Sequence, residues 1–127
     1  MRQLLKSAAA VLVAGAVAAS PVYAASPEGE WESGPRDQRY QIKLCGDGDD
    51  LCGWLIFSSD KSAEAQKLVN TMVLDTAVNI APSTWKGSMT LSGYQLSGTI
   101  RLIDANTLRI NACALFVICG EFNLYRA

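Results

Sequence analysis

The sequence contains no histidine among its 127 residues, and this absence excludes several kinds of chemistry. Neither a Ser-His-Asp triad nor a Cys-His pair can be assembled without an imidazole. The C-x-x-C spacing typical of thiol oxidoreductases is also missing. We therefore predict no catalytic residue, no cofactor and no enzymatic activity for this chain.

The sequence has few charges and no cluster of basic residues. Eleven Lys and Arg residues against twelve Asp and Glu residues leave a formal net charge of −1. Proteins that bind nucleic acid or anionic membranes present a concentrated positive surface instead. We therefore expect neither nucleic acid nor a membrane surface as a partner.

No hydrophobic run in the chain is long enough to cross a bilayer, which takes about 20 apolar residues. The longest small-and-apolar run covers residues 7–19, and Ser20-Pro21 ends it. It follows a positive start with Arg2 and Lys6, and Val22-Tyr23-Ala24 has the small residues of a signal-peptidase site. This pattern predicts a cleaved helical signal peptide, with a retained anchor as the alternative.

Cleavage near Ala24 leaves a single domain over residues 25–127, about 100 residues long. We expect this mature chain to be periplasmic or secreted, without a transmembrane segment, and to be a monomer. All four cysteines lie in it, and an even number in an exported chain of this size indicates two disulfides. A zinc site is disfavoured by the loose C-x6-C and C-x5-C spacings and by the lack of histidine, so no metal is predicted.

Alternation of apolar and polar residues is the main pattern of the mature chain. Tyr94 to Leu102 is the best example, with Tyr94, Leu96 and Ile100 on the inner face. Similar segments between turn signals predict antiparallel strands at 39–45, 52–57, 85–91, 107–113 and 119–126. Gly87 is expected at a bulge or at a close approach of two strands.

Residues 62–74 differ, because their apolar positions lie near one helical face and Ser62 can cap the start. We expect one short helix there, although the β-branched residues of 71–80 are also compatible with a strand. The chain is thus predicted to be all-β, an antiparallel meander forming a sandwich or a closed barrel.

The strand pattern favours local disulfides. Cys113 and Cys119 lie on the outward faces of two neighbouring hairpin strands, where opposed Cβ atoms are about 4.5–5.5 Å apart. This separation is close to what an S–S bond requires. Cys45 and Cys52 likewise flank an acidic, glycine-rich turn. We therefore predict the pairs Cys45–Cys52 and Cys113–Cys119.

Trp31 and Arg126 stand near the two ends of the mature chain. A tryptophan on the first strand can cover the base of a barrel, and an arginine from the last strand can stack on its indole. We expect this pair to close the barrel. The alternative is a partly buried aromatic residue and an unrelated terminal arginine.

The apolar residues of the barrel interior are the candidate ligand-binding residues. We predict that Trp54, Phe57, Tyr94, Leu96 and Ile100 point inward, in a barrel that is either filled or hollow. Residues 114–118, which include Phe116, are unusually apolar for a turn. They form a lip over the barrel mouth, a patch for a protein partner, or a tip folded back on the core.

Together these segments resemble a family of exported bacterial proteins of unknown function with a lipocalin-like (calycin) β-barrel. The resemblance covers nearly all of residues 28–126, and the segments that depart from the family pattern are 62–74 and 88–91. It implies a barrel of about eight strands and binding of a small apolar molecule. The matching residues are Gly29-Glu30-Trp31, 42–45, 51–56, 85–87, the strand that ends at Leu102, 104–110, Cys113 and Tyr125-Arg126.

The leading hypothesis is an exported binding protein whose small hydrophobic ligand contacts Trp54, Tyr94, Leu96, Ile100 and Phe116. The alternative is a periplasmic inhibitor of a protease or lysozyme that acts through its surface, because small disulfide-bonded barrels that open with G-x-W also look like metalloprotease inhibitors. An inhibitor that inserts its N-terminus needs free residues before Trp31, and residues 25–28 form a short segment for this purpose.

Overall fold

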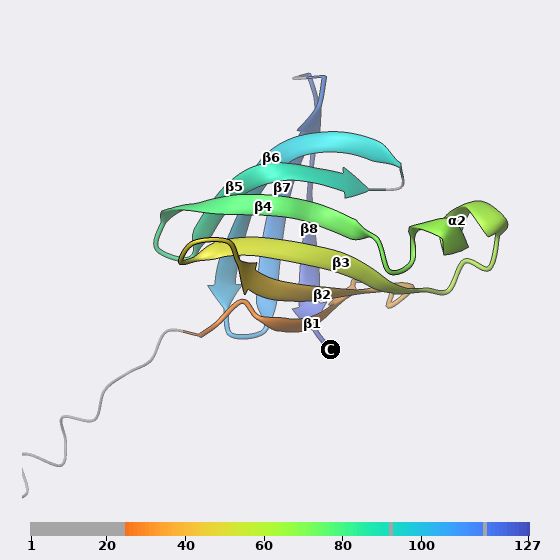
Figure 1. Ribbon diagram of the computed structural model, residues 1–127, viewed down its shortest axis with the longest axis horizontal. Helices are drawn as coiled ribbons and strands as arrows, with labels where there is room; N and C mark the ends of the chain where they lie inside the picture. The colour runs from red at the N-terminus through yellow and green to blue at the C-terminus, as the bar shows by residue number, and fades with distance from the viewer. Residues whose placement is uncertain (1–24, 92, 116) are drawn as a thin grey trace, which may run out of the picture.

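The computed structural model describes residues 25–91, 93–115 and 117–127. The predicted signal peptide at 1–24 and the candidate residue Phe116 lie outside the described residues. Each strand pairs with the next in antiparallel fashion, and the last returns to the first, so the sheet closes into a barrel (Figure 1). The strands are β1 (Gly29–Ser33), β2 (Gln38–Cys45), β3 (Asp50–Ser58), β4 (Met72–Ala81), β5 (Thr84–Leu91), β6 (Tyr94–Asp104), β7 (Thr107–Ala114) and β8 (Ile118–Arg126). This is the all-β barrel of about eight strands predicted from the sequence.

The alternation of the sequence sets the inner face of the barrel. In β6, Ile100 and Leu102 are buried while Arg101 between them is exposed. Gly87 in β5 lies at a close approach of two strands, because a Cβ there would meet the Ala77 Cα of β4 at 2.8 Å. The sequence therefore predicts both the inner face of β6 and the special position of Gly87.

The two chain ends close one end of the barrel around Trp31. Its indole is fully buried, its Nε1 donates to the Pro27 carbonyl at 2.9 Å, and the Arg126 guanidinium lies 4.2 Å from its ring centre. Arg126 also donates to the carbonyls of Ala105, Glu28 and Ser26 at 2.8–2.9 Å. The expected Trp31–Arg126 contact is present, and it ties the first and last strands together.

The opposite end of the barrel carries the short helix α2 (Ala63–Leu68). Ser62 caps it, as predicted, by accepting a hydrogen bond from the Ala65 amide at 3.2 Å. The expected helix extended to residue 74, but the chain leaves the helical conformation before Asn70, whose φ is +70°. The Asn70 amide donates to the Leu55 carbonyl of β3 at 2.6 Å. Pairing with β3 therefore overrides the helical pattern, and residues 72–81 form β4.

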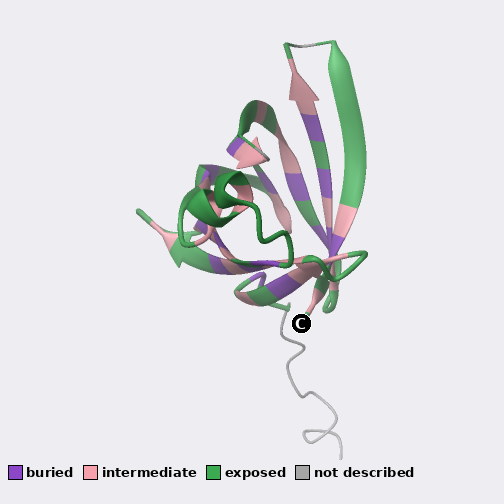
Figure 2. Ribbon diagram, turned by 90° about the vertical axis from the view of Figure 1, so that its right-hand side faces the viewer, coloured by how far each residue is buried: buried purple, intermediate pink, exposed green. Residues whose placement is uncertain are grey.

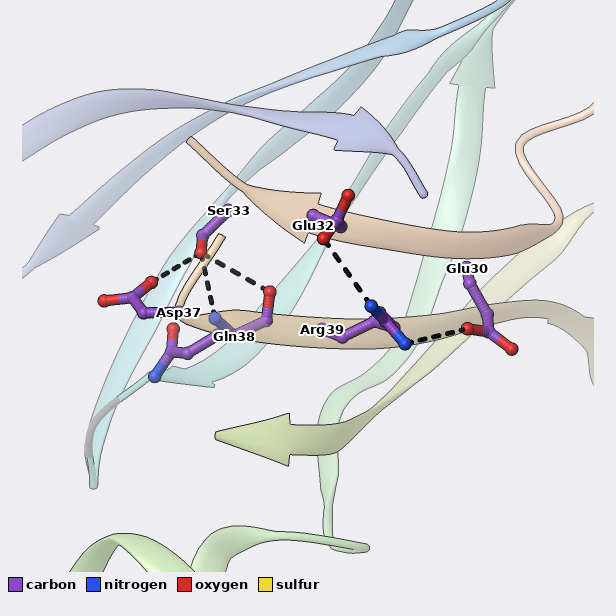
Figure 3. A network of polar contacts seen from close by, with 6 residues as sticks. All are labelled: Glu30, Glu32, Ser33, Asp37, Gln38 and Arg39. Atoms are coloured by element: carbon purple, nitrogen blue, oxygen red, sulfur yellow. Dashed lines mark hydrogen bonds and ion pairs between the residues drawn. The ribbon is translucent and has the colours of Figure 1, made fainter. Parts of the chain in front are cut away.

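Polar contacts hold the turn between β1 and β2 at the same end (Figure 3). The Ser33 hydroxyl donates to Asp37 Oδ1 at 2.6 Å and accepts from the Gln38 amide at 3.1 Å. Arg39 on β2 lies between Glu30 and Glu32 of β1, at 4.0 and 3.7 Å. These contacts fix the start of β2, and with it the position of Tyr40.

The β7–β8 hairpin rises beyond the rest of the barrel (Figure 2). We call residues 112–115 and 117–122 the spur. The disulfide Cys113–Cys119 crosses it, and Cys45–Cys52 joins β2 to β3 at the closed end. These are the two local pairs favoured by the sequence, and two disulfides are typical of a chain that folds in an oxidising environment.

Candidate functional site

Side chains nearly fill the barrel interior. The remaining cavity measures about 30 Å³, enough for a water molecule or one small group, since a single water needs about 10–15 Å³ of such space. The sequence left open whether the barrel is hollow, and the structure shows a filled core with this small residual space. The cavity is lined by Tyr40, Ile42, Leu51, Val73, Leu74, Met89, Leu91, Ile100, Leu108, Ile110, Phe122 and Leu124.

A larger apolar hollow, which we call the trough, follows the inner face of the spur. It has a volume of about 230 Å³ and is lined by Leu96, Ala112, Ala114, Ile118, Cys119, Gly120 and Phe122. Phe122 lines both the trough and the interior cavity. An apolar surface therefore continues from the spur to the barrel interior.

The trough is hollow because its floor carries small side chains. A Cβ built at Gly120 would have no heavy atom within 4 Å, and Ala112 and Ala114 add only methyl groups. These short side chains leave space that larger residues on the same face would fill.

The trough is open because β1 is shorter than its neighbour. β1 pairs with β8 at only three positions, Trp31↔Arg126, Glu32↔Tyr125 and Ser33↔Leu124. Among the described residues, positions 118–123 of β8 therefore pair with β7 alone. Ile118 is 66% exposed and Phe122 is 36% exposed as a result.

Tyr40 supplies the polar group of the interior cavity. Its hydroxyl donates to Gln38 Oε1 at 2.6 Å. Burial, with a smaller contribution from the negative charge of Asp37, raises the pKa of Tyr40 to about 12. The hydroxyl therefore stays protonated in the physiological range and acts as a neutral hydrogen-bonding group.

The predicted ligand-binding residues divide into inner and outer positions. Ile100 lines the interior cavity and Leu96 lines the trough. Tyr94 is in register with the inward-facing residues of β6. Because it is the first residue of the strand, however, it lies at the end of the barrel and is 71% exposed. The structure thus brings Ile100 and Leu96 to the candidate site and leaves Tyr94 at its rim.

The prediction that Trp54 and Phe57 point inward is wrong. Both faces of β3 are apolar, so alternation does not select one, and the large apolar side chains that are buried are Leu51 and Leu55. Trp54 borders an outer groove with Gln41, Lys43, Ile56 and Asn70. Phe57 is 40% exposed, with the Lys61 ammonium 5.1 Å from its ring centre.

The tip of the spur does not fold back on the core. Leu115 is 80% exposed and Val117 is 78% exposed, and Ile118 beside them is also open to solvent. For the described residues this excludes the interpretation that residues 114–118 fold back on the core. The lip over the barrel mouth and the patch for a protein partner remain.

Sequence reasoning did not name Phe122, Gly120 or Ala112 as site residues. Alternation in 107–113 and 119–126 places all three on the inner face, so the signal was present. Glycine and alanine carry no chemistry that identifies a site, and their contribution is the space that they leave empty.

The described residues contain no group of three or more His, Cys, Asp or Glu side chains arranged to hold a metal ion. Over residues 25–91, 93–115 and 117–127, no helix is long and apolar enough to cross a membrane.

Comparisons with known proteins give a match at the level of the fold. No family model and no curated protein matches the sequence. Among solved structures, a protein of the human pathogen Helicobacter pylori that belongs to the lipocalin family superposes with a TM-score of 0.62. The match covers 82% of this chain and 84% of that chain, at 12% sequence identity. With its closed eight-stranded antiparallel meander, the chain therefore has a lipocalin-like fold.

Proposed function

We propose that this chain is an exported, periplasmic binding protein that holds a small apolar molecule at the open end of its barrel. The observation that carries this proposal is the continuous apolar surface from the trough over Phe122 to the interior cavity. Predominantly apolar concave surfaces with few polar groups are the usual sites for small molecules. The predicted signal peptide and the two disulfides support export.

The two volumes restrict the size and position of the ligand. The cavity of about 30 Å³ cannot take more than one small group, so most of the ligand lies in the trough of about 230 Å³. This space is below the range of about 300–1,000 Å³ for drug-sized molecules. We infer a short alkyl chain or a single aromatic ring as the bound group.

Leu96 and Ile100 keep their predicted role in this proposal, and Phe122, Ala112 and Gly120 join them. Tyr94, at the start of β6, is proposed as a contact at the rim. Phe116 lies outside the described residues and stays a proposed contact on the sequence alone. Trp54 is not included, because it borders the outer groove.

Substitution of Gly120 by leucine tests the site directly. A Cβ at Gly120 would meet no heavy atom within 4 Å, so the leucine side chain is expected to enter the open space of the trough. Asn111→Leu is the matched control, because Asn111 is exposed on the opposite face of β7. Isothermal titration calorimetry with toluene, a single-ring apolar probe, should give a dissociation constant raised at least about tenfold in Gly120→Leu and unchanged in Asn111→Leu.

The exposed spur tip supports a second candidate, a protein contact through residues 114–118. Leu115, Val117 and Ile118 expose apolar surface of the kind found at protein–protein interfaces. This contact is compatible with the inhibitor hypothesis. The N-terminal version of that hypothesis is less favourable, because the carbonyls of Ser26, Pro27 and Glu28 are hydrogen-bonded to Trp31 and Arg126. Native mass spectrometry of the purified chain separates the two candidates, since only the carrier should retain a small apolar molecule.

A further inference from the structure

The free edge of β8 leads to an inference that does not depend on the proposed ligand. Among the described residues, positions 118–123 pair with β7 on one side only. Every second residue of such an edge directs its amide and carbonyl groups away from the sheet. An extended strand is the partner that satisfies such a row of groups.

We propose that β8 pairs antiparallel with β8 of a second copy of this chain, with Gly120 on the two-fold axis. Antiparallel partners must direct their side chains to the same face of the sheet. A symmetric pair is therefore centred on a residue, so that residue i faces residue i of the other copy. We call positions 118–123 the free segment. Within it, residues 119, 120 and 121 are the possible centres.

The side chains favour Gly120 as the centre. In this register Ile118 of each copy faces Phe122 of the other, and these are the two exposed apolar side chains on the inner face of the free segment. A centre at Glu121 would place two carboxylates face to face, which is unfavourable. A centre at Cys119 would leave Phe122 opposite the spur tip instead of Ile118.

The outer face of the spur is compatible with the same register. Glu121 faces Cys119 of the other copy, which is held in a disulfide and carries no charge. The two Glu121 side chains are then diagonal neighbours, and the ion pair with Arg109 at 3.2 Å reduces their repulsion. The dimer would also cover apolar side chains that are open in the single chain. This dimer differs from the monomer expected from the sequence. The sequence alone does not show that β1 pairs with only part of β8.

Sedimentation velocity of residues 25–127, stripped of bound molecules, tests this pairing between about 10 µM and about 1 mM. The wild-type chain should show a reversible monomer–dimer equilibrium. Ile118→Lys places two positive charges at the shared edge and should raise the dimer dissociation constant at least about tenfold. Ile80→Lys is the matched control, because Ile80 is similarly exposed at 55% but lies on β4; its dissociation constant should equal that of the wild type.

A third variant tests the proposed register of the two β8 strands. Glu121→Gln removes the diagonal repulsion, so the dimer should become tighter, and the gain should shrink at high salt. A wild-type chain that stays monomeric over the whole range overturns the proposal. A dimer that Ile118→Lys leaves unchanged overturns it as well, because the contact then lies on another surface. Because Ile118 also lines the trough, ligand binding by the same variants is measured separately by probe titration.

Discussion

Tyr40 shows how a single residue combines a structural and a polar role at the open end. Its ring lines the interior cavity, and its hydroxyl donates a hydrogen bond to Gln38 Oε1. Because the ionised phenolate would be poorly solvated there, burial raises the pKa of Tyr40 from 10.0 to about 12. The folded chain therefore binds this proton more tightly than the unfolded chain does.

This pKa difference predicts a loss of stability in alkali. The contribution of Tyr40 is fully present below pH 10, the unfolded value, and it disappears as the pH rises through the folded value of about 12. The free energy of unfolding should fall by about 2–3 kcal/mol over that range from this group alone. Urea unfolding of the wild type and of Tyr40→Phe at several pH values checks it.

Tyr40→Phe should flatten this part of the alkaline profile, at a cost of about 1 kcal/mol near neutrality from the lost hydrogen bond to Gln38. Tyr94→Phe is the control, because Tyr94 is 71% exposed, and it should follow the wild type. Equal alkaline losses in Tyr40→Phe and in the wild type would contradict the assignment.

At the scale of the strand, two glycines have opposite surroundings: Gly98 is tightly packed, and Gly120 faces open space. A Cβ at Gly98 of β6 would overlap the Asn111 carbonyl oxygen and lie 2.7 Å from the Ala112 Cα, both backbone atoms of β7. Backbone cannot move aside without disturbing the β6–β7 ladder. At Gly120 of β8, on the same inner face, no heavy atom lies within 4 Å.

Two alanine substitutions should therefore have opposite outcomes. Gly98→Ala is expected to lower the free energy of unfolding by about 2–3 kcal/mol through overpacking. Gly120→Ala should leave it unchanged or raise it by about 0.5 kcal/mol, because alanine reduces the freedom of the unfolded chain. Chemical denaturation of both variants measures the difference. Similar losses at the two positions would show that the trough is already occupied.

Strands whose two faces differ in polarity could be predicted, and the others could not. Tyr94 to Leu102 alternates cleanly, so its inner face follows from the sequence. β3 is apolar on both faces, so Trp54 was assigned to the wrong side. Residues 62–74 have a helical pattern, but only α2 forms a helix, because the Asn70 amide and the Thr71 carbonyl pair with Leu55 of β3. A contact distant in the sequence decided that boundary.

At the scale of the whole molecule, the barrel is tied at one end and open at the other. Trp31, Arg126 and the Cys45–Cys52 disulfide all lie at the closed end. At the open end, the length of β1 determines how far β8 is paired. The candidate site depends on this difference in strand length, which composition and periodicity do not encode. The fold could thus be predicted from the sequence, whereas the trough required the register of all eight strands.

A ligand in the trough should stabilise the whole domain, because it binds the folded chain and not the unfolded one. At a concentration about 100-fold above its dissociation constant, the gain is about 2.7 kcal/mol. For a domain of about 100 residues, each kcal/mol raises the melting temperature by roughly 4–8 °C. A bound molecule should therefore shift thermal unfolding by about 10 °C or more.

The chain purified from an exporting host should accordingly melt at a higher temperature than the same chain refolded after organic extraction. Addition of toluene to the extracted chain should restore part of this difference in the wild type and in Asn111→Leu. In Gly120→Leu the added side chain occupies the trough, so extraction and probe should both leave the melting temperature unchanged. If Gly120→Leu gains as much as the wild type does, the stabilising molecule lies elsewhere, and the outer groove beside Trp54 becomes the next place to test.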